Sequence, residues 1–265
     1  MKLSVQKYSQ PRMYTFGIIT IFSVQFFCNL ALQEEKCSGH VCIPPNYESF
    51  NRPSHKELLI VSVNFSNIWI QKVDAIEHTI SLSLEIWMTW EEPRLEVVNG
   101  TLQENKSYAI DKSFLNLLWI PDLYIYDAKK VDKNGMVGDL ESLAYEPKSK
   151  MHFLTYLVTL NVEVVCHHLY FDDYPFDSHV CLFEIGSHTY PKEELIVTEL
   201  IYDKQKGFLC SDYMFDLDNF PIEKNESKFG YSKTGFQMTL QRNIEKYVFN
   251  YYIPSGLMVI TLWVR

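Results

Sequence analysis

The stretch VVCHHLYFDDYPFDSHVC, from Val164 to Cys181, places fourteen residues between two cysteines and has strand-like sequence on both sides. A metal site, a redox pair and a structural disulfide each use two cysteines. Zinc sites bring their ligands in tight pairs such as C-x2-C, whereas the adjacent His167 and His168 would point to opposite faces of an extended strand. The sequence contains no C-x-x-C redox motif. A disulfide that closes a loop between two strands is the better interpretation, and it contributes about 3 kcal/mol by chain entropy.

The tip of this loop is apolar. Pro175 fixes a bend, and Tyr174 and Phe176 on either side of it offer apolar surface. Apolar surface exposed on a tied loop predicts contact with another surface.

Alternation of apolar with other residues dominates the rest of the sequence. This period of two is typical of half-buried strands, and turn formers such as Asn99-Gly100 separate the runs. The pattern predicts an all-β sandwich or barrel, with strands within residues 58–65, 80–90, 153–165 and 236–242. Ser113 to Leu118 is expected to form one short helical turn.

The two ends of the chain have a different character. Lys2, Lys7 and Arg12 precede an apolar run from residue 14 to 27, and small residues follow near Ala31. This order predicts a signal peptide over residues 1–31. At the other end, residues 253–264 form an apolar run closed by Arg265. A helix of about 12 residues cannot cross a hydrocarbon core of about 30 Å, so we interpret residues 250–265 as the truncated start of a first transmembrane helix.

Further features predict export. N-glycosylation sequons begin at Asn64, Asn99, Asn105 and Asn225. In an oxidising compartment the close pairs Cys37/Cys42 and Cys166/Cys181 can each form a disulfide, which leaves Cys210 over. A leftover thiol can pair between chains or stay buried, and burial is the commoner case.

Composition and motifs exclude other classes. The net charge is -9 and no basic cluster is present, which argues against nucleic acid as a partner. We find no pairing of a nucleophile with a base, no phosphate loop and no metal cluster in the sequence. We therefore expect neither enzyme activity nor a cofactor.

Four motifs stand in the order of one known family. They are the Cys-x14-Cys loop with Tyr174-Pro-Phe-Asp177, Trp119-Ile-Pro-Asp122, Trp90-Glu-Glu-Pro-Arg94-Leu95, and Arg242 followed by Tyr251-Tyr-Ile-Pro254. Together they resemble the Cys-loop, or pentameric ligand-gated, ion channels over residues 58–265, with an invertebrate-like subunit related to the glycine or GABA type among the candidates. The sequence departs from the family pattern in two places. Its loop holds one residue more than the usual thirteen, and Glu92 replaces the usual aspartate.

The resemblance implies an extracellular, Ig-like β-sandwich of about ten strands over residues 32–249, with a short N-terminal helix or extension. It also implies that ligand binds between neighbouring subunits in a box of aromatic residues. Counted from the motifs, one face of the subunit would contribute Tyr124, Tyr126, His188, Tyr190 and Tyr231. The opposite face would contribute Glu85, Trp87, Thr155 and Leu157.

The chemistry of these positions leaves the agonist open between an amine, an amino acid, a proton and zinc. Aromatic rings such as Tyr126 and Trp87 can surround a cationic amine, at about 0.5–2 kcal/mol per contact. Receptors for amino acids in this family often place an arginine where this chain has Glu85 and Trp87, so a ligand carboxylate would lose its usual partner. His188, with Glu85 across the subunit boundary, could sense protons or bind a divalent metal. It could also merely fill the aromatic position.

Other motif residues have coupling or structural roles. The resemblance assigns coupling to the pore to Tyr174, Pro175, Phe176, Asp177, Asp74 and Arg242. Plain core and turn roles are expected for Trp90, Trp119 and Pro121. Asp122, Glu92 and Arg94 are expected to form an ion-pair network.

The implied function is the ligand-binding domain of a channel subunit. Such a subunit would sit in the plasma membrane, with this domain outside the cell, as one of five like or unlike subunits. The alternative is a secreted ligand-binding protein or decoy subunit without a pore, if the chain truly ends at Arg265. An unrelated secreted sandwich with an adhesion role is the third interpretation.

Overall fold

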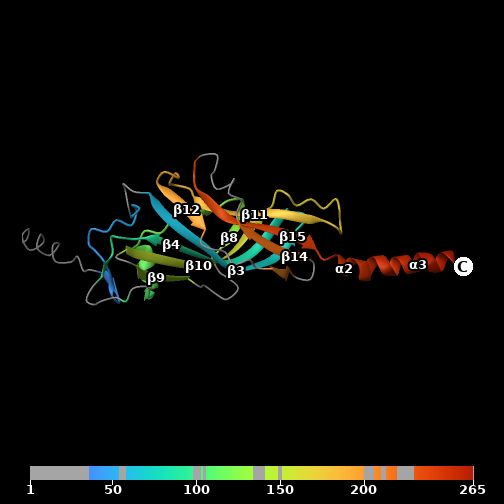
Figure 1. Ribbon diagram of the computed structural model, residues 1–265, viewed down its shortest axis with the longest axis horizontal. Coiled ribbons are helices and arrows are strands. Elements are labelled where there is room, and N and C mark those ends of the chain that lie inside the picture. The colour runs from blue at the N-terminus through green and yellow to red at the C-terminus, as the bar shows by residue number, and fades with distance from the viewer. Residues whose placement is uncertain are drawn as a thin grey trace, which may run out of the picture.

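Two β-sheets packed face to face make up most of the protein (Figure 1). The computed structural model describes residues 36–53, 58–97, 103, 106–133, 141–148, 151–199, 206–209, 213–219 and 230–264. The predicted signal peptide, the predicted N-terminal helix or extension before residue 36, Cys210 and the sequons at Asn99, Asn105 and Asn225 lie outside these described residues.

The larger sheet has seven strands in the order β12-β3-β4-β10-β9-β6, with β8 also paired to β10. Its strands are β3 (Leu59–Asp74), β4 (Thr79–Glu91), β6 (Tyr108–Ile110), β8 (Ala128–Asp132), β9 (Glu141–Lys148), β10 (Met151–Val165) and β12 (Leu195–Glu199). The second sheet has the order β13-β14-β15-β11-β7. Its strands are β7 (Leu123–Ile125), β11 (Ser178–Ser187), β13 (Lys206–Leu209), β14 (Tyr213–Asn219) and β15 (Lys233–Arg242). A small third sheet joins β1 (Lys36–Ser38), β2 (Val41–Ile43) and β5 (Glu96–Val97).

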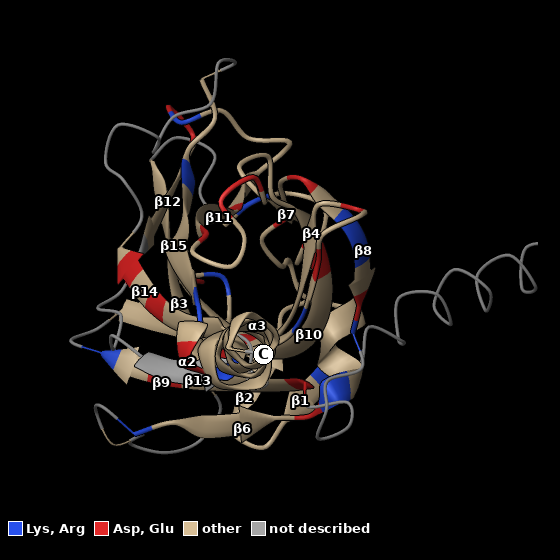
Figure 2. Cartoon of the chain, turned by 90° about the vertical axis from the view of Figure 1, so that its right-hand side faces the viewer, with Lys and Arg blue, Asp and Glu red and all other residues tan. Residues whose placement is uncertain are grey.

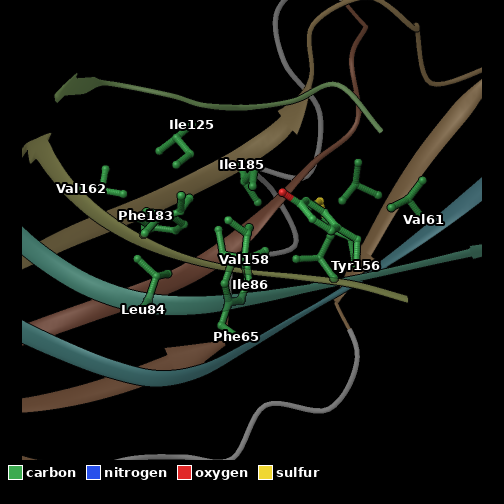
Figure 3. Packing of buried hydrophobic residues seen from close by; sticks show 14 of the residues in the cluster. Val61, Phe65, Leu84, Ile86, Ile125, Tyr156, Val158, Val162, Phe183 and Ile185 are labelled. Atoms are coloured by element: carbon green, nitrogen blue, oxygen red, sulfur yellow. The ribbon is translucent and has the colours of Figure 1, made fainter. Parts of the chain in front are cut away.

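The core lies between the two large sheets and is built from alternate residues of their strands. In β4 every second residue is buried: Ile80, Leu82, Leu84, Ile86, Met88 and Trp90. Figure 3 shows side chains of both sheets pointing into this core, among them Phe65 of β3 and Phe183 of β11. The rings of Phe183 and Phe236 stack at 4.8 Å, and Phe65 meets both edge-on. Each such ring contributes about 1.5–3 kcal/mol through burial.

The predicted fold class is confirmed. The four predicted strands fall in β3, β4, β10 and β15, and the predicted helical turn is the 3-10 helix η1 (Lys112–Asn116), whose first turn is capped by Asp111. Short strands such as β1, β2 and β5 raise the strand number in the described residues above the expected ten.

Disulfides join Cys37 to Cys42 and Cys166 to Cys181. The first links β1 to β2, and the second ties the end of β10 to β11 and closes the loop of residues 167–180. In Figure 1 this loop (yellow) lies at the end of the sandwich from which the C-terminal helix leaves.

A helical segment follows β15 and projects from the sandwich (Figure 1). It consists of α2 (Ile244–Tyr247), the π-helical turn η3 (Val248–Tyr252) and α3 (Ile253–Trp263). Viewed along its axis in Figure 2, α3 carries none of the charged residues that are scattered over the sandwich. Its apolar side chains are exposed, up to 87% at Trp263. Within the described part of the chain, we find no helix with the length and apolar character needed to cross a membrane.

Candidate functional site

Asp122, which directly precedes β7, is hydrogen bonded to the segment that follows β11. It therefore links the two segments that carry Tyr124, Tyr126 and His188. One carboxylate oxygen accepts a hydrogen bond from the hydroxyl of Ser187 (3.1 Å), and the other accepts one from the backbone N–H of Thr189 (2.9 Å). The predicted ion-pair network is therefore wrong for Asp122. Its hydrogen bonds instead fix the position of His188, which lies between the two residues it holds.

The rings of Tyr124, Tyr126 and His188 lie side by side at this place. The centroid of the Tyr124 ring is 5.4 Å from that of Tyr126, edge-on, and 5.7 Å from that of His188. Gly186 lets the segments approach, because a Cβ there would lie 2.4 Å from the carbonyl oxygen of Ser232 and 3.3 Å from the Tyr126 ring. The Tyr124 side chain is 49% exposed, so its ring can be reached by a ligand.

A lysine of the chain itself occupies the face of Tyr126. The Nζ atom of Lys233 lies 3.9 Å from the ring centroid and 2.7 Å from a carboxylate oxygen of Glu184. Both side chains are only 16% exposed. Burial, followed by the charge of Glu184 and the neighbouring phenols of Tyr231 and Tyr124, raises the pKa of Tyr126. The sequence motifs did not predict a role for Lys233 or Glu184.

Tyr231 and Tyr190, the two other aromatic residues predicted for this face, differ in their surroundings. Tyr231 is partly buried, and its phenol is near enough to influence Tyr126. Tyr190 packs against the core, with its ring edge-on to Trp119 at 6.2 Å. Tyr190 is thus placed where it supports the loop that carries His188.

The residues predicted for the opposite face lie on the larger sheet, along β4 and β10. The indole N–H of Trp87 donates to the hydroxyl of Ser66 (2.9 Å), which donates in turn to a carboxylate oxygen of Glu85 (3.0 Å). Ser66 of β3 therefore positions both side chains, a role that the sequence motifs did not predict. Thr155 shares a hydrogen bond with Thr89 (3.0 Å). Leu157 is paired with Trp87 across the strands.

No group of three or more His, Cys, Asp or Glu side chains in the described ranges could hold a metal ion. Glu85 lies on β4 of the larger sheet and is hydrogen bonded to Ser66, whereas His188 directly follows β11 of the second sheet.

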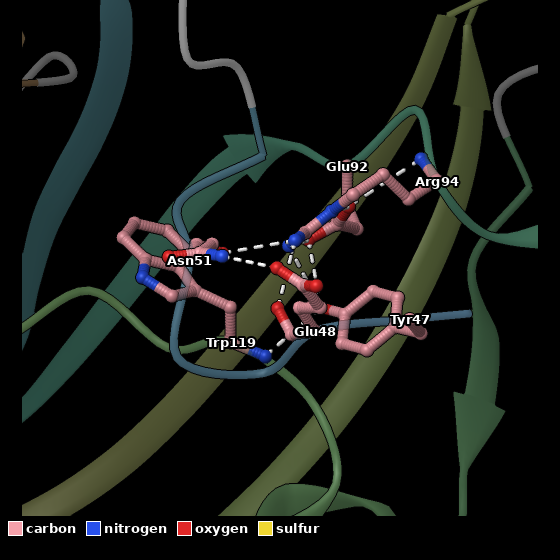
Figure 4. Close-up of polar contacts among 6 residues, drawn as sticks. All are labelled: Tyr47, Glu48, Asn51, Glu92, Arg94 and Trp119. Carbon is pink, nitrogen blue, oxygen red and sulfur yellow. Dashed lines mark hydrogen bonds and ion pairs between the residues drawn. The ribbon is translucent and has the colours of Figure 1, made fainter. Parts of the chain in front are cut away.

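The Trp119 loop is held by a buried network around Arg94 (Figure 4). The guanidinium donates to both carboxylate oxygens of Glu92 at 2.7 Å each and to the hydroxyl of Tyr47 at 3.0 Å. It also donates to the carbonyls of Glu48 and Asn51. The Tyr47 hydroxyl donates to Glu92 and accepts from the backbone N–H of Trp119. Burial alone would lower the pKa of Arg94, but the hydrogen bond and charge of Glu92 raise it overall.

A second buried ion pair lies at the helical end of the sandwich. Arg242, the last residue of β15, donates to both carboxylate oxygens of Asp177 (2.6 and 2.8 Å) and also to the hydroxyls of Tyr213 and Tyr247. His179 lies 2.6 Å from the same carboxylate. Burial alone would raise the pKa of Asp177, and the hydrogen bonds from Arg242 and His179 more than offset this and lower it.

The other residues predicted for coupling surround this pair or lie at a nearby turn. Tyr174 and Phe176 flank Pro175 and are exposed, and the Tyr174 ring meets that of Tyr247 edge-on at 5.3 Å. Asp74 accepts hydrogen bonds from the backbone N–H groups of residues 76 and 77 and pairs with Lys72. The hydrogen bond from Lys72 is the main reason that the pKa of Asp74 is lowered to about 2.

Comparison with known proteins adds independent findings. The model of a family described as neurotransmitter-gated ion-channel ligand binding domain matches residues 41–244. Gamma-aminobutyric acid receptor subunit rho-1 of Mus musculus is 24% identical over 204 residues, covering 74% of this chain and 40% of the relative. Subunit rho-2 of Homo sapiens is 26% identical over 204 residues (74% and 42%), and rho-3 of Rattus norvegicus is 25% identical over 208 residues (73% and 43%). The chain thus spans about two fifths of the length of these relatives.

Proposed function

Because this chain belongs to the neurotransmitter-gated ion-channel ligand-binding domain family, we propose that it binds a small ligand between neighbouring subunits and couples binding to the opening of a pore. The family consists of ligand-gated channels, so the chain is not an enzyme. The observation that carries the proposal is the cluster of Tyr124, Tyr126 and His188, fixed by Asp122 and open to a ligand at Tyr124.

A complete site requires a second subunit. The aromatic cluster lies on β7 and on the residues that directly follow β7 and β11 of the five-stranded sheet, and the Glu85–Ser66–Trp87 group lies on the other sheet. If the second group faces the cluster of a neighbour, each boundary holds one site. This arrangement supports assembly into a ring of five like or unlike subunits.

The proposed ligand is a small amine or amino acid. The carboxylates of Glu184 and Glu85 and the open ring of Tyr124 suit an amino group, and the ammonium of Lys233 suits a carboxylate. The relatives are named gamma-aminobutyric acid receptor subunits, and that ligand carries both groups.

We further propose that residues 32–249 are extracellular and that residues 250–265 begin a transmembrane helix in the plasma membrane. The uncharged, exposed surface of α3 supports this, because apolar side chains in that number favour a hydrocarbon environment.

Titration of the full chain tests the proposal. The chain, alone and co-expressed with a rho-1 subunit, is purified in detergent and titrated with γ-aminobutyric acid, glycine, aromatic amines, zinc and protons while its intrinsic fluorescence is recorded. Tyr124→Ala should weaken amine or amino-acid binding about 2- to 30-fold, since one aromatic contact contributes about 0.5–2 kcal/mol. Tyr170→Ala is the matched control, because Tyr170 is an exposed tyrosine of the disulfide loop. If neither preparation responds to an amine or an amino acid at millimolar concentration, the proposal fails.

A further inference from the structure

Lys233 and Tyr124 lie in one row across the second sheet, with a glycine between them. Gly186 of β11 is paired with Lys233 of β15 on one side and with Tyr124 of β7 on the other. Directly paired residues point to the same face of a sheet, so the lysine shares the outer face with the exposed ring of Tyr124. Neighbouring strands are about 4.8 Å apart, which places the two Cα atoms about 10 Å from each other.

The place over Tyr126 that would receive a ligand's ammonium is filled by the chain itself. The Nζ atom of Lys233 lies 3.9 Å from the centroid of the Tyr126 ring, within the range of about 6 Å over which a ring attracts a cation. The same atom is 2.7 Å from a carboxylate oxygen of Glu184. An amine that bound here would have to release Lys233, exchanging one ammonium for another on the same ring and the same carboxylate. Such an exchange yields no net interaction, so these two residues do not favour an amine.

The ammonium of Lys233 can still bind another acceptor. It has three N–H donors, and within the described residues only the Glu184 carboxylate accepts a hydrogen bond from it. The lysine side chain is 16% exposed, so it remains within reach of a ligand. A ligand carboxylate would make a charge-assisted hydrogen bond with it, about twice as strong as one between neutral groups. The negative charge of Glu184 opposes a second carboxylate and therefore limits the affinity.

We propose that Lys233 determines ligand specificity as a built-in ammonium, so that the site requires a carboxylate and excludes simple amines. This specificity rests on the proposed function, because it belongs to the same site. It narrows the ligand class to small carboxylates, with or without an amino group. Where the ligand has an amino group, that group lies at the ring of Tyr124 or at the Glu85–Trp87 wall of the neighbouring subunit.

Butylamine, butyrate and γ-aminobutyrate test this, because they share one carbon chain and differ in their charged ends. Their affinities are measured by calorimetry on the full chain in detergent, alone and co-expressed with a rho-1 subunit. The wild type should bind butyrate more tightly than butylamine by about tenfold or more, as expected for one hydrogen bond between charged groups. Lys233→Met should reverse this order, and Lys233→Arg should keep it. Lys129→Met is the matched control and should also keep it, because Lys129 has the same charge but pairs with Glu77 and with Glu163 of the larger sheet.

Glu184→Gln is a second variant that leaves the lysine in place. It removes the opposing charge and keeps a hydrogen-bond acceptor, so it should tighten butyrate binding by about 2- to 5-fold. If thermal unfolding shows that Lys233→Met is not folded, Glu184→Gln decides the question, and unchanged or weaker butyrate binding overturns the specificity of Lys233.

The outcomes separate this specificity from the proposed function. A wild type that prefers butylamine, or a folded Lys233→Met that keeps the order of the wild type, counts against the role of Lys233 alone. If none of the three probes binds to either preparation, the proposed function fails and the specificity fails with it. Because only this chain is altered, differences between variants of the co-expressed preparation arise at its own sites.

Discussion

Replacement of Arg94 with lysine tests how the loop at Trp119, which leads into β7 and Tyr124, is held in place. All five N–H donors of Arg94 are used, two of them on the carboxylate of Glu92. The Glu92 side chain has 0% exposure, so water cannot replace a lost partner. The same network reaches the backbone of Trp119 through the hydroxyl of Tyr47.

The expected loss of stability follows from the number of hydrogen-bond donors that lysine lacks. Lysine keeps the positive charge but supplies three donors in place of five, so at least two hydrogen bonds are lost. Each hydrogen bond to a charged group contributes about 1.5–3 kcal/mol, and partial rearrangement of the lysine should recover some of the loss. We expect the free energy of unfolding to fall by about 2–4 kcal/mol, somewhat less than the roughly 3–5 kcal/mol for removing one partner of a buried pair. For a domain of this size the melting temperature should fall by about 5–15 °C.

The assay is thermal unfolding of the purified full chain at neutral pH, followed by near-ultraviolet circular dichroism. Lys130→Ala is the matched control, because Lys130 also pairs with a carboxylate, that of Asp132, but both side chains are largely exposed. Such exposed pairs contribute about 0–1 kcal/mol, so the control should melt close to the wild type. If Arg94→Lys melts within about 2 °C of the wild type, the five-donor arrangement does not hold the loop and the reasoning is refuted.

Three further changes have defined outcomes. The lowered pKa of Asp177 means that its stabilisation is complete above the unfolded pKa of about 4 and is lost as pH falls through the folded pKa. Urea unfolding should therefore show the wild type losing its advantage over Asp177→Asn below about pH 4, and a constant difference would contradict this. Gly186→Ala places a Cβ 2.4 Å from the carbonyl oxygen of Ser232 and should cost about 1–3 kcal/mol in thermal unfolding; an unchanged melting temperature would show that β11 and β15 adapt freely. Lys233→Met vacates the face of Tyr126 and should tighten amine binding about 2- to 30-fold by calorimetry, whereas Lys233→Arg should not.

The long strands are predictable from sequence because burial of one face imposes a period of two. Residues 80–90 place an apolar residue at every even position, and β4 follows them almost to the residue. The ion pair of Glu92 and Arg94 is equally predictable from the sequence, because its partners are two positions apart and one turn brings them together. In these cases the decisive contact is local or repeats regularly along one element.

Contacts of the site depend instead on strand register, which a single sequence does not specify. Asp122 binds a hydroxyl 65 positions away, and for that reason its partners were predicted wrongly. Glu184 and Lys233 are 49 positions apart and meet through the pairing of β11 with β15. Neither residue stands out by composition, because a lone lysine and a lone glutamate are common on strand surfaces.

β15 runs from the proposed ligand site to the end of the sandwich from which the helical segment leaves. β15 begins at Lys233, over Tyr126, and ends nine positions later at Arg242, which holds Asp177 and Tyr247. At about 3.3 Å per residue the Cα atoms of these two residues are about 30 Å apart. β15 is hydrogen bonded to β11 along residues 233–241 and to β14 along residues 236–242, so a shift of its first residues strains the ladder with β11. We therefore expect a ligand that displaces Lys233 to change amide hydrogen exchange along the whole of β15, and protection altered only near its start would show that the strand does not transmit the change.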